Sequence, residues 1–202
     1  MAFDLEKFDF KQIKKHSSSQ AEIYFCRFNL AKLPLARIKE GLKQRNLGDH
    51  RAAEIYVSRS MISWLLSKEG LDQPWNQVSL RGHCQIDGLS GHLSLAHTRS
   101  ICLVARSPAP VGVDIELKNR KINLASQDKF IGPGDSFAFN DLLKKWCFKE
   151  AAFKALATQS PKAPKTLKEV EVKGERFYYN EASGSLDFLK LEGHIVALAK
   201  LT

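Results

Sequence analysis

The stretch that decides the fold is Val111-Gly112-Val113-Asp114-Ile115-Glu116. Successive side chains of a strand point to opposite faces, so Asp114 and Glu116 share one face while Val113 and Ile115 share the other. Apolar residues on one face and acidic residues on the other predict a strand that buries one side and presents carboxylates on the other. A strand also holds these carboxylates in a fixed geometry, which metal coordination requires.

A second informative stretch is Trp146-Cys147-Phe148-Lys149-Glu150-Ala151-Ala152-Phe153-Lys154-Ala155. Residues four apart are neighbours on a helix surface, so Trp146, Glu150 and Lys154 are expected along one side of a helix. If this helix packs against the strand, three carboxylates meet beside a lysine. Such a cluster repels itself unless a cation neutralises it. Mg²⁺ is usually held by a few carboxylates together with substrate phosphates, so the pattern points to a magnesium site.

The bulk properties fit a globular protein of 202 residues, enough for one or two small lobes. No apolar run approaches the roughly 18 residues of a membrane span, and the N-terminus lacks the basic-then-apolar order of a secretory signal. Four scattered cysteines indicate reduced thiols, so we expect a cytoplasmic protein without a membrane contact. The net charge of +9 indicates either a solvated basic surface or attraction to a nucleic acid, a nucleotide coenzyme or an acidic protein.

Local patterns predict an α+β fold, because helices and strands mix without βαβ regularity. Helices are expected over residues 35–42, 49–70 and from residue 140 or 141 to 157. Strands are expected over residues 21–30, 93–97, 101–106 and 111–117, with four more in the tail at 166–172, 175–180, 186–191 and 194–201. Short strands are also expected near residues 78–80 and 83–86.

Together with a third segment, Ser94-Leu95-Ala96-His97-Thr98-Arg99-Ser100, the two stretches resemble the motifs of the 4′-phosphopantetheinyl transferases in their order along the chain. Ala96 and Thr98 stand where the family segment has serines. The chain length resembles the surfactin-synthetase-activating type. That resemblance implies a pseudo-dimer of two similar lobes, each a small antiparallel sheet packed with a long helix. We expect the N-terminal lobe over residues 1–108 and the C-terminal lobe over residues 109–202.

The resemblance also implies the reaction and its residues. The 4′-phosphopantetheine group of coenzyme A would pass to a serine of an apo acyl or peptidyl carrier protein, releasing adenosine 3′,5′-bisphosphate. Mg²⁺, or Mn²⁺ in its place, would be held by Asp114, Glu116 and Glu150. Glu150 would also act as the base, directly or through a bound water, and Lys154 would assist as a catalytic residue. Binding of coenzyme A is assigned to His97, Lys154 and Arg59.

The expected partner is an acidic carrier protein, and the protein itself is expected to be a monomer. We expect some of the basic residues near the two stretches to attract the carrier: Lys118, Arg120, Lys121, Lys144 and Lys145. Two alternatives remain from the sequence. One is a catalytically weak module that only binds carrier proteins, and the other is a nucleic-acid-binding module. The latter requires basic residues interleaved with exposed aromatic residues on one face, which the sequence does not clearly contain.

Overall fold

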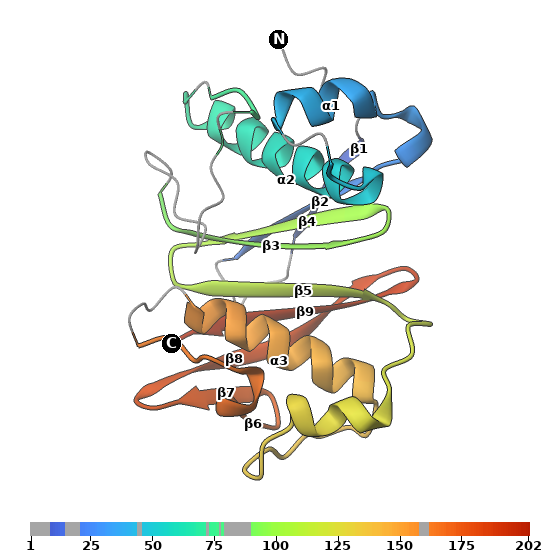
Figure 1. Ribbon diagram of the computed structural model, residues 1–202. Helices are drawn as coiled ribbons and strands as arrows, with labels where there is room; N and C mark the ends of the chain where they lie inside the picture. The colour runs from blue at the N-terminus through green and yellow to red at the C-terminus, as the bar shows by residue number, and fades with distance from the viewer. Residues whose placement is uncertain are drawn as a thin grey trace.

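The computed structural model describes residues 9–14, 21–43, 46–71, 73–76, 78, 90–157 and 162–202. The fold is α+β, as predicted, with two antiparallel sheets that pack face to face between two long helices (Figure 1). In order, the layers are helix α2, the first sheet, the second sheet and helix α3 (Figure 1). No helix in the described ranges is both long and apolar enough to cross a bilayer.

The first sheet comes from the N-terminal part of the chain and has the strand order β1-β2-β4-β3. Its strands are β1 (Asp9–Lys14), β2 (Glu22–Arg27), β3 (His92–Thr98) and β4 (Ile101–Ser107). The helical segments that accompany it are η2 (Leu30–Lys32), α1 (Leu35–Gly41) and α2 (Asp49–Lys68). Helix α2 buries Val57, Met61 and Leu65 against this sheet, so one apolar face of the helix closes the first core.

The second sheet comes from the C-terminal part and has the order β5-β9-β8-β7-β6. Its strands are β5 (Val111–Leu117), β6 (Glu171–Lys173), β7 (Arg176–Tyr179), β8 (Ala182–Leu191) and β9 (His194–Leu201). Helix α3 (Leu142–Ala157) covers this sheet, and the short helices η3 (Leu124–Lys129) and η4 (Leu167–Glu169) lie in the connections. The Asp141 carboxylate accepts hydrogen bonds from the backbone of Leu143 and Lys144, which caps the start of α3 as predicted.

Most predicted elements are present within a few residues of their expected bounds. The strand expected over 166–172 is mostly absent, because η4 occupies Leu167–Glu169 and only β6 (Glu171–Lys173) is a strand. Three further differences concern other elements. Asp49 is expected from the sequence as the N-cap of the second helix, but it is the first residue of α2; Gly48 is the N-cap, and the helix ends at Lys68. The strand predicted over 21–30 stops at Arg27 because η2 begins at Leu30. Strand β1 was not predicted, because the sequence of Asp9–Lys14 is mostly polar. Of the short strand expected near 78–80 only residue 78 is described, and the strand expected near 83–86 lies outside the described residues.

Strand β5 has the two faces that its alternation predicts. Val111, Val113 and Ile115 are buried between the two sheets, where they meet apolar residues of β4 and β9. The opposite face carries Asp114 and Glu116 and is turned toward α3. Strand β5 therefore separates the central core of the molecule from the carboxylates.

Helix α3 packs directly on the backbone of β5. A Cβ atom placed on Gly112 would lie 1.9 Å from the carbonyl oxygen of Ala151 and 2.5 Å from the backbone nitrogen of Ala155. Glycine on the strand and two alanines on the helix together permit this approach, because none of them places a large side chain between the two backbones. The contact fixes the position of the helix over the strand.

Gly112→Ala should therefore destabilise the fold. The added methyl group meets backbone atoms that cannot move out of its way, and overpacking of this kind costs about 1–3 kcal/mol or more. Urea denaturation followed by circular dichroism measures the loss. Gly48→Ala is the matched control, since its added methyl meets nothing within 4 Å. Equal stability of the two variants would contradict the proposed close contact.

Candidate functional site

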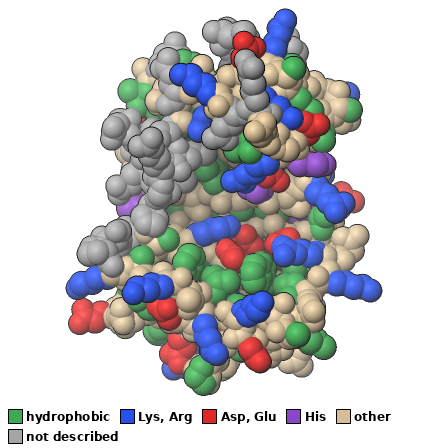
Figure 2. Space-filling model, in the orientation of Figure 1, with side chains coloured by type: hydrophobic (Ala, Val, Ile, Leu, Met, Phe, Trp, Pro, Cys, Tyr) green, Lys and Arg blue, Asp and Glu red, His purple; other side chains and the backbone are tan. Residues whose placement is uncertain are grey.

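The candidate site lies where β5, α3 and β3 approach one another, at the boundary between the two halves of the molecule. Figure 2 shows acidic side chains flanked by basic ones in the middle of this face. They lie along one side of a recessed band, and histidine and basic side chains lie along the other side (Figure 2). Charged side chains of both signs thus face one another across this band (Figure 2).

Lys154 joins α3 to β5 at the centre of the site. Its Nζ donates to Asp114 Oδ1 at 2.8 Å and to the carbonyl oxygen of Val113 at 3.0 Å. The Asp114 side chain is only 10% exposed and that of Lys154 is 30% exposed. The sequence prediction that the helix brings a lysine to the acidic strand is confirmed. The ammonium group is held by two acceptors, so its position is fixed while one side still faces solvent.

Glu116 and Glu150 complete the acidic cluster. Glu116 forms an ion pair with Arg120, and both partners retain some exposure. Burial raises the pKa of Glu116 above its ordinary value, and the charges of Asp114 and Glu150 raise it further. Burial likewise raises the pKa of Glu150, whereas Lys154 lowers it and Asp114 raises it. Asp114 therefore lies close enough to both glutamates to affect their ionisation, in the cluster that the sequence predicts.

These carboxylates are not arranged as a finished metal site. In the described ranges, no three His, Cys, Asp or Glu side chains are grouped so that they could hold an ion. The reason is visible in their partners: Asp114 is turned to Lys154 and Glu116 to Arg120. However, Asp114 Oδ2 is buried and accepts no hydrogen bond of ordinary geometry from the described part of the chain; the Cys147 thiol is its buried neighbour, and burial together with Asp114 raises the pKa of that thiol. A buried carboxylate oxygen without a donor, next to two more carboxylates, fits a hard cation such as Mg²⁺.

The histidine predicted to bind the coenzyme faces this cluster from β3. Arg51 Nη1 lies 3.1 Å from His97 Nε2, and Glu54 Oε1 lies 3.3 Å from His97 Nδ1. A guanidinium can only donate, so Nε2 accepts and the neutral ring carries its proton on Nδ1, facing Glu54. Burial lowers the pKa of His97, which favours this neutral form. The neutral imidazole therefore holds Arg51 at the edge of the recessed band.

Arg59, the other predicted coenzyme ligand, lies elsewhere on α2. No hydrogen bond or ion pair of the described residues joins it to His97 or Lys154. Its Nε is buried without a hydrogen-bond partner in the described part of the chain, and burial lowers its pKa. Arg51 is thus the arginine of α2 that contacts the site. Glu54, which contacts His97, was not predicted; its spacing of three residues from Arg51 on the helix is the signal that could have found it.

The charges around His97 predict that two substitutions shift its pKa in opposite directions. Glu54 raises the pKa of His97 and Arg51 lowers it, while burial keeps it below the ordinary value of 6.5. Arg51→Gln should therefore raise the pKa of His97, and Glu54→Gln should lower it further. An NMR titration of the imidazole Cε1 proton measures both changes. Shifts of the same sign in the two variants would contradict the arrangement.

A buried ion pair lies at α3, next to the residues of the acidic cluster. Lys149 and Asp135 have fully buried side chains, with Lys149 Nζ 2.6 Å from Asp135 Oδ2. The same carboxylate accepts the backbone N–H groups of Gly132 and Val172, and Lys149 also donates to the carbonyl oxygen of Val170. Burial lowers the pKa of Lys149, and Asp135 opposes that change. The pair joins α3 to the segment before it and to β6, and so holds the helix that carries Glu150.

Lys149→Met should be strongly destabilising, because it leaves the Asp135 carboxylate buried without a countercharge. Breaking a buried pair on one side costs about 3–5 kcal/mol. Lys173→Met is the matched control: Lys173 pairs with Glu171 at 2.9 Å, but both are partly exposed. Its loss should cost at most about 1 kcal/mol. Comparable unfolding midpoints for the two variants in urea would show that the buried pair has no special role in stability.

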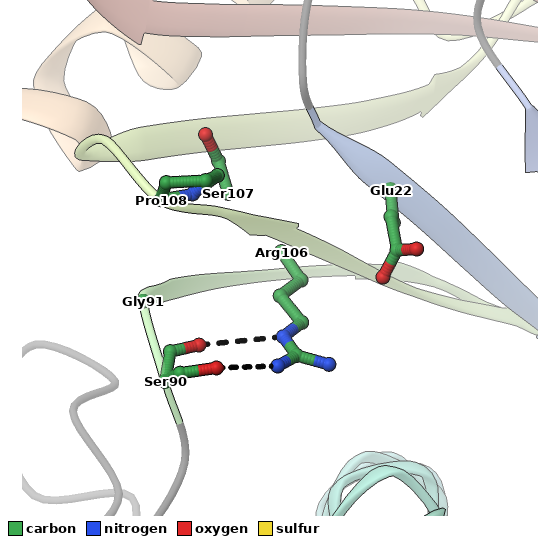
Figure 3. A pocket seen from close by; sticks show the side chains of 6 residues that line it. All are labelled: Glu22, Ser90, Gly91, Arg106, Ser107 and Pro108. Atoms are coloured by element: carbon green, nitrogen blue, oxygen red, sulfur yellow. Dashed lines mark hydrogen bonds between the residues drawn. The ribbon is translucent and has the colours of Figure 1, made fainter.

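A separate hollow lies at the other end of β3 from His97. Arg106 crosses it, donating to Ser90 Oγ at 2.8 Å and to the Ser90 carbonyl oxygen at 3.4 Å (Figure 3). Arg106 also pairs with Glu69 at 2.7 Å. The rest of the lining consists of Glu22, Gly91, Ser107 and Pro108 (Figure 3). Because the arginine is bound by its own neighbours, this hollow is a weaker candidate for chemistry than the acidic cluster.

Comparison with known proteins adds no assignment to this geometry. The chain matches no protein-family model. No curated protein matches it either.

Proposed function

We propose that the protein transfers the 4′-phosphopantetheine group of coenzyme A to a serine hydroxyl of an acidic apo acyl or peptidyl carrier protein. The observation that carries the proposal is the meeting of Asp114, Glu116 and Glu150 beside Lys154, with one buried carboxylate oxygen left without a donor. These are the residues that resemble the transferase motifs. Their convergence from two distant segments supports the resemblance beyond sequence order.

The proposal includes two similar lobes in a monomer, divided near the Pro108–Pro110 connection. The support is architectural. Each part of the chain supplies one antiparallel sheet and one long helix that covers its outer face, and the two sheets pack on each other (Figure 1). The acidic cluster then belongs to the C-terminal lobe, residues 109–202, whereas His97 and Arg51 belong to the N-terminal lobe, residues 1–108. The donor would bind across the boundary between them.

Asp114, Glu116 and Glu150 are the residues that would hold Mg²⁺, or Mn²⁺ in its place. The ion would supply positive charge for the pyrophosphate of coenzyme A. Holding it would require Asp114 and Glu116 to turn partly away from their partners, Lys154 and Arg120. Those two cations would then be free to contact phosphate oxygens. The two cations that balance the cluster in this structure thus become available to the substrate.

The transfer itself breaks one bond and forms another at the β-phosphorus of coenzyme A. The serine oxygen forms the new P–O bond, the bond to the bridging pyrophosphate oxygen breaks, and adenosine 3′,5′-bisphosphate leaves. Glu150 takes the serine proton, directly or through a water; burial raises its pKa and makes it a better base than an exposed glutamate. Lys154 and Arg51 place positive charge where the leaving phosphate becomes more negative.

Intact-mass spectrometry of an apo carrier protein tests the proposal. After incubation with the protein, coenzyme A and Mg²⁺, the carrier should gain the mass of one phosphopantetheine group. Glu150→Gln should slow the gain on the order of 100-fold or more, because it removes the proton acceptor and a metal ligand. Addition of a chelator should have a similar effect.

Glu181→Gln is the matched control, since Glu181 is an exposed glutamate in the turn between β7 and β8. It should transfer at the wild-type rate. Absence of any mass gain with carriers from fatty acid, polyketide and nonribosomal peptide synthesis would sink the proposal. It would leave the two alternatives, a module that only binds carriers or one that binds nucleic acid.

A further inference from the structure

A groove of about 510 Å³ lies at the tip of the β8–β9 hairpin, beside the first turn of α3. Apolar side chains line part of it, among them Phe188, Leu191 and Ile195, and three lysines contribute to its wall, Lys118, Lys144 and Lys190. We call this feature the hairpin groove. It combines an apolar surface with an excess of positive charge, since Glu192 is the one acidic residue in its lining.

The lysines of the hairpin groove can contact a partner, and the side chain of Lys144 is oriented by neighbouring aromatic rings. Lys118 and Lys190 are exposed. Lys144 Nζ lies 5.8 Å from the ring centre of Phe188 and 6.0 Å from that of Phe139. An ammonium group over aromatic rings is attracted by their electrons and loses part of its freedom before any partner arrives. Less entropy is then lost when a carboxylate binds it.

The hairpin groove borders the candidate active site. Ile195 is the direct partner of Glu116 in the pairing of β9 with β5. Lys118 follows Glu116 by two residues on the chain, and its backbone N–H donates to the carbonyl oxygen of Gly193 at the hairpin turn. Lys144 precedes Glu150 on α3 by less than two helical turns, roughly 9 Å along the axis. A molecule in the groove therefore lies next to the carboxylates.

We propose that the hairpin groove docks an acidic amphipathic segment of the protein whose serine is modified. This proposal rests on the proposed function. The charge excess requires carboxylates on the partner, and the apolar lining requires aliphatic side chains between them. Docking there sets the partner's serine beside Glu116 and Glu150. The acidic cluster repels carboxylates and so cannot bind an acidic partner. The hairpin groove therefore supplies the binding of the protein substrate.

The lining favours a protein segment over a nucleic acid. Single strands bind by stacking their bases on open aromatic faces. Here the phenyl ring of the lining, that of Phe188, is already stacked on Phe148 with ring centres 4.2 Å apart, and much of the remaining lining is aliphatic. Glu192 in the lining and Glu116 beside it would also repel a phosphate backbone.

The test is binding of a fluorescein-labelled acidic apo acyl carrier protein, followed by fluorescence anisotropy without coenzyme A or Mg²⁺. The double variant Lys144→Glu/Lys190→Glu should raise Kd at least about tenfold at low salt and flatten its salt dependence. Lys68→Glu is the matched control, because Lys68 is also an exposed lysine over an aromatic ring, with its Nζ 4.8 Å from the Trp64 ring centre, but lies at the end of α2. It should keep Kd within about twofold of the wild type. Circular dichroism verifies that both variants are folded.

The outcomes separate this inference from the proposed function. Wild-type binding that the double variant loses, without any phosphopantetheine transfer, supports the groove and contradicts the activity. Transfer with unchanged carrier binding in the double variant supports the activity and overturns the groove. Wild-type protein that binds no acidic carrier also overturns the groove. The groove proposal is also overturned if the double variant loses binding to single-stranded RNA but keeps its affinity for the carrier.

Discussion

The site depends on the direct contact between helix α3 and strand β5 at Gly112. With no side chain at this position, the backbone of Ala151 and Ala155 rests on the strand, and the helix lies closer than a layer of side chains would permit. Lys154, on the same helix, can then reach both Val113 and Asp114. Any larger residue at Gly112 would separate the lysine from the acidic strand. A packing constraint thus determines which charges meet.

The close packing of α3 on β5 also brings three carboxylates together, and their mutual repulsion defines the site. Asp114, Glu116 and Glu150 share a partly buried site, where burial and the charge of Asp114 raise the pKa values of Glu116 and Glu150 and so disfavour their charged forms. Lys154 and Arg120 offset part of this charge, yet one oxygen of Asp114 stays buried without a donor. A divalent cation would balance the remaining charge. Behind the helix, the buried pair of Lys149 and Asp135 prevents α3 from turning these groups away.

Much of this could be predicted from the sequence, because it rests on periodicity. The alternation around Asp114 predicted the strand and its two faces, and the spacing of Trp146, Glu150 and Lys154 predicted a single helix face. Periodicity cannot predict which residues from distant parts of the sequence form a contact. Asp135 has no local signal that pairs it with Lys149. Arg59 was predicted to bind the coenzyme, but the sequence does not reveal which residues of α2 face β3; the structure places Arg51 there, beside Glu54.

Binding of Mn²⁺ tests the central claim that these carboxylates form a cation site completed by a phosphate-bearing substrate. Free Mn²⁺ has a strong electron paramagnetic resonance signal that falls when the ion is bound. With coenzyme A present, the wild-type protein should bind Mn²⁺ much more tightly than Asp114→Asn does, and more tightly than it does without coenzyme A. Equal binding by the two proteins, or no binding by the wild type, would contradict the account.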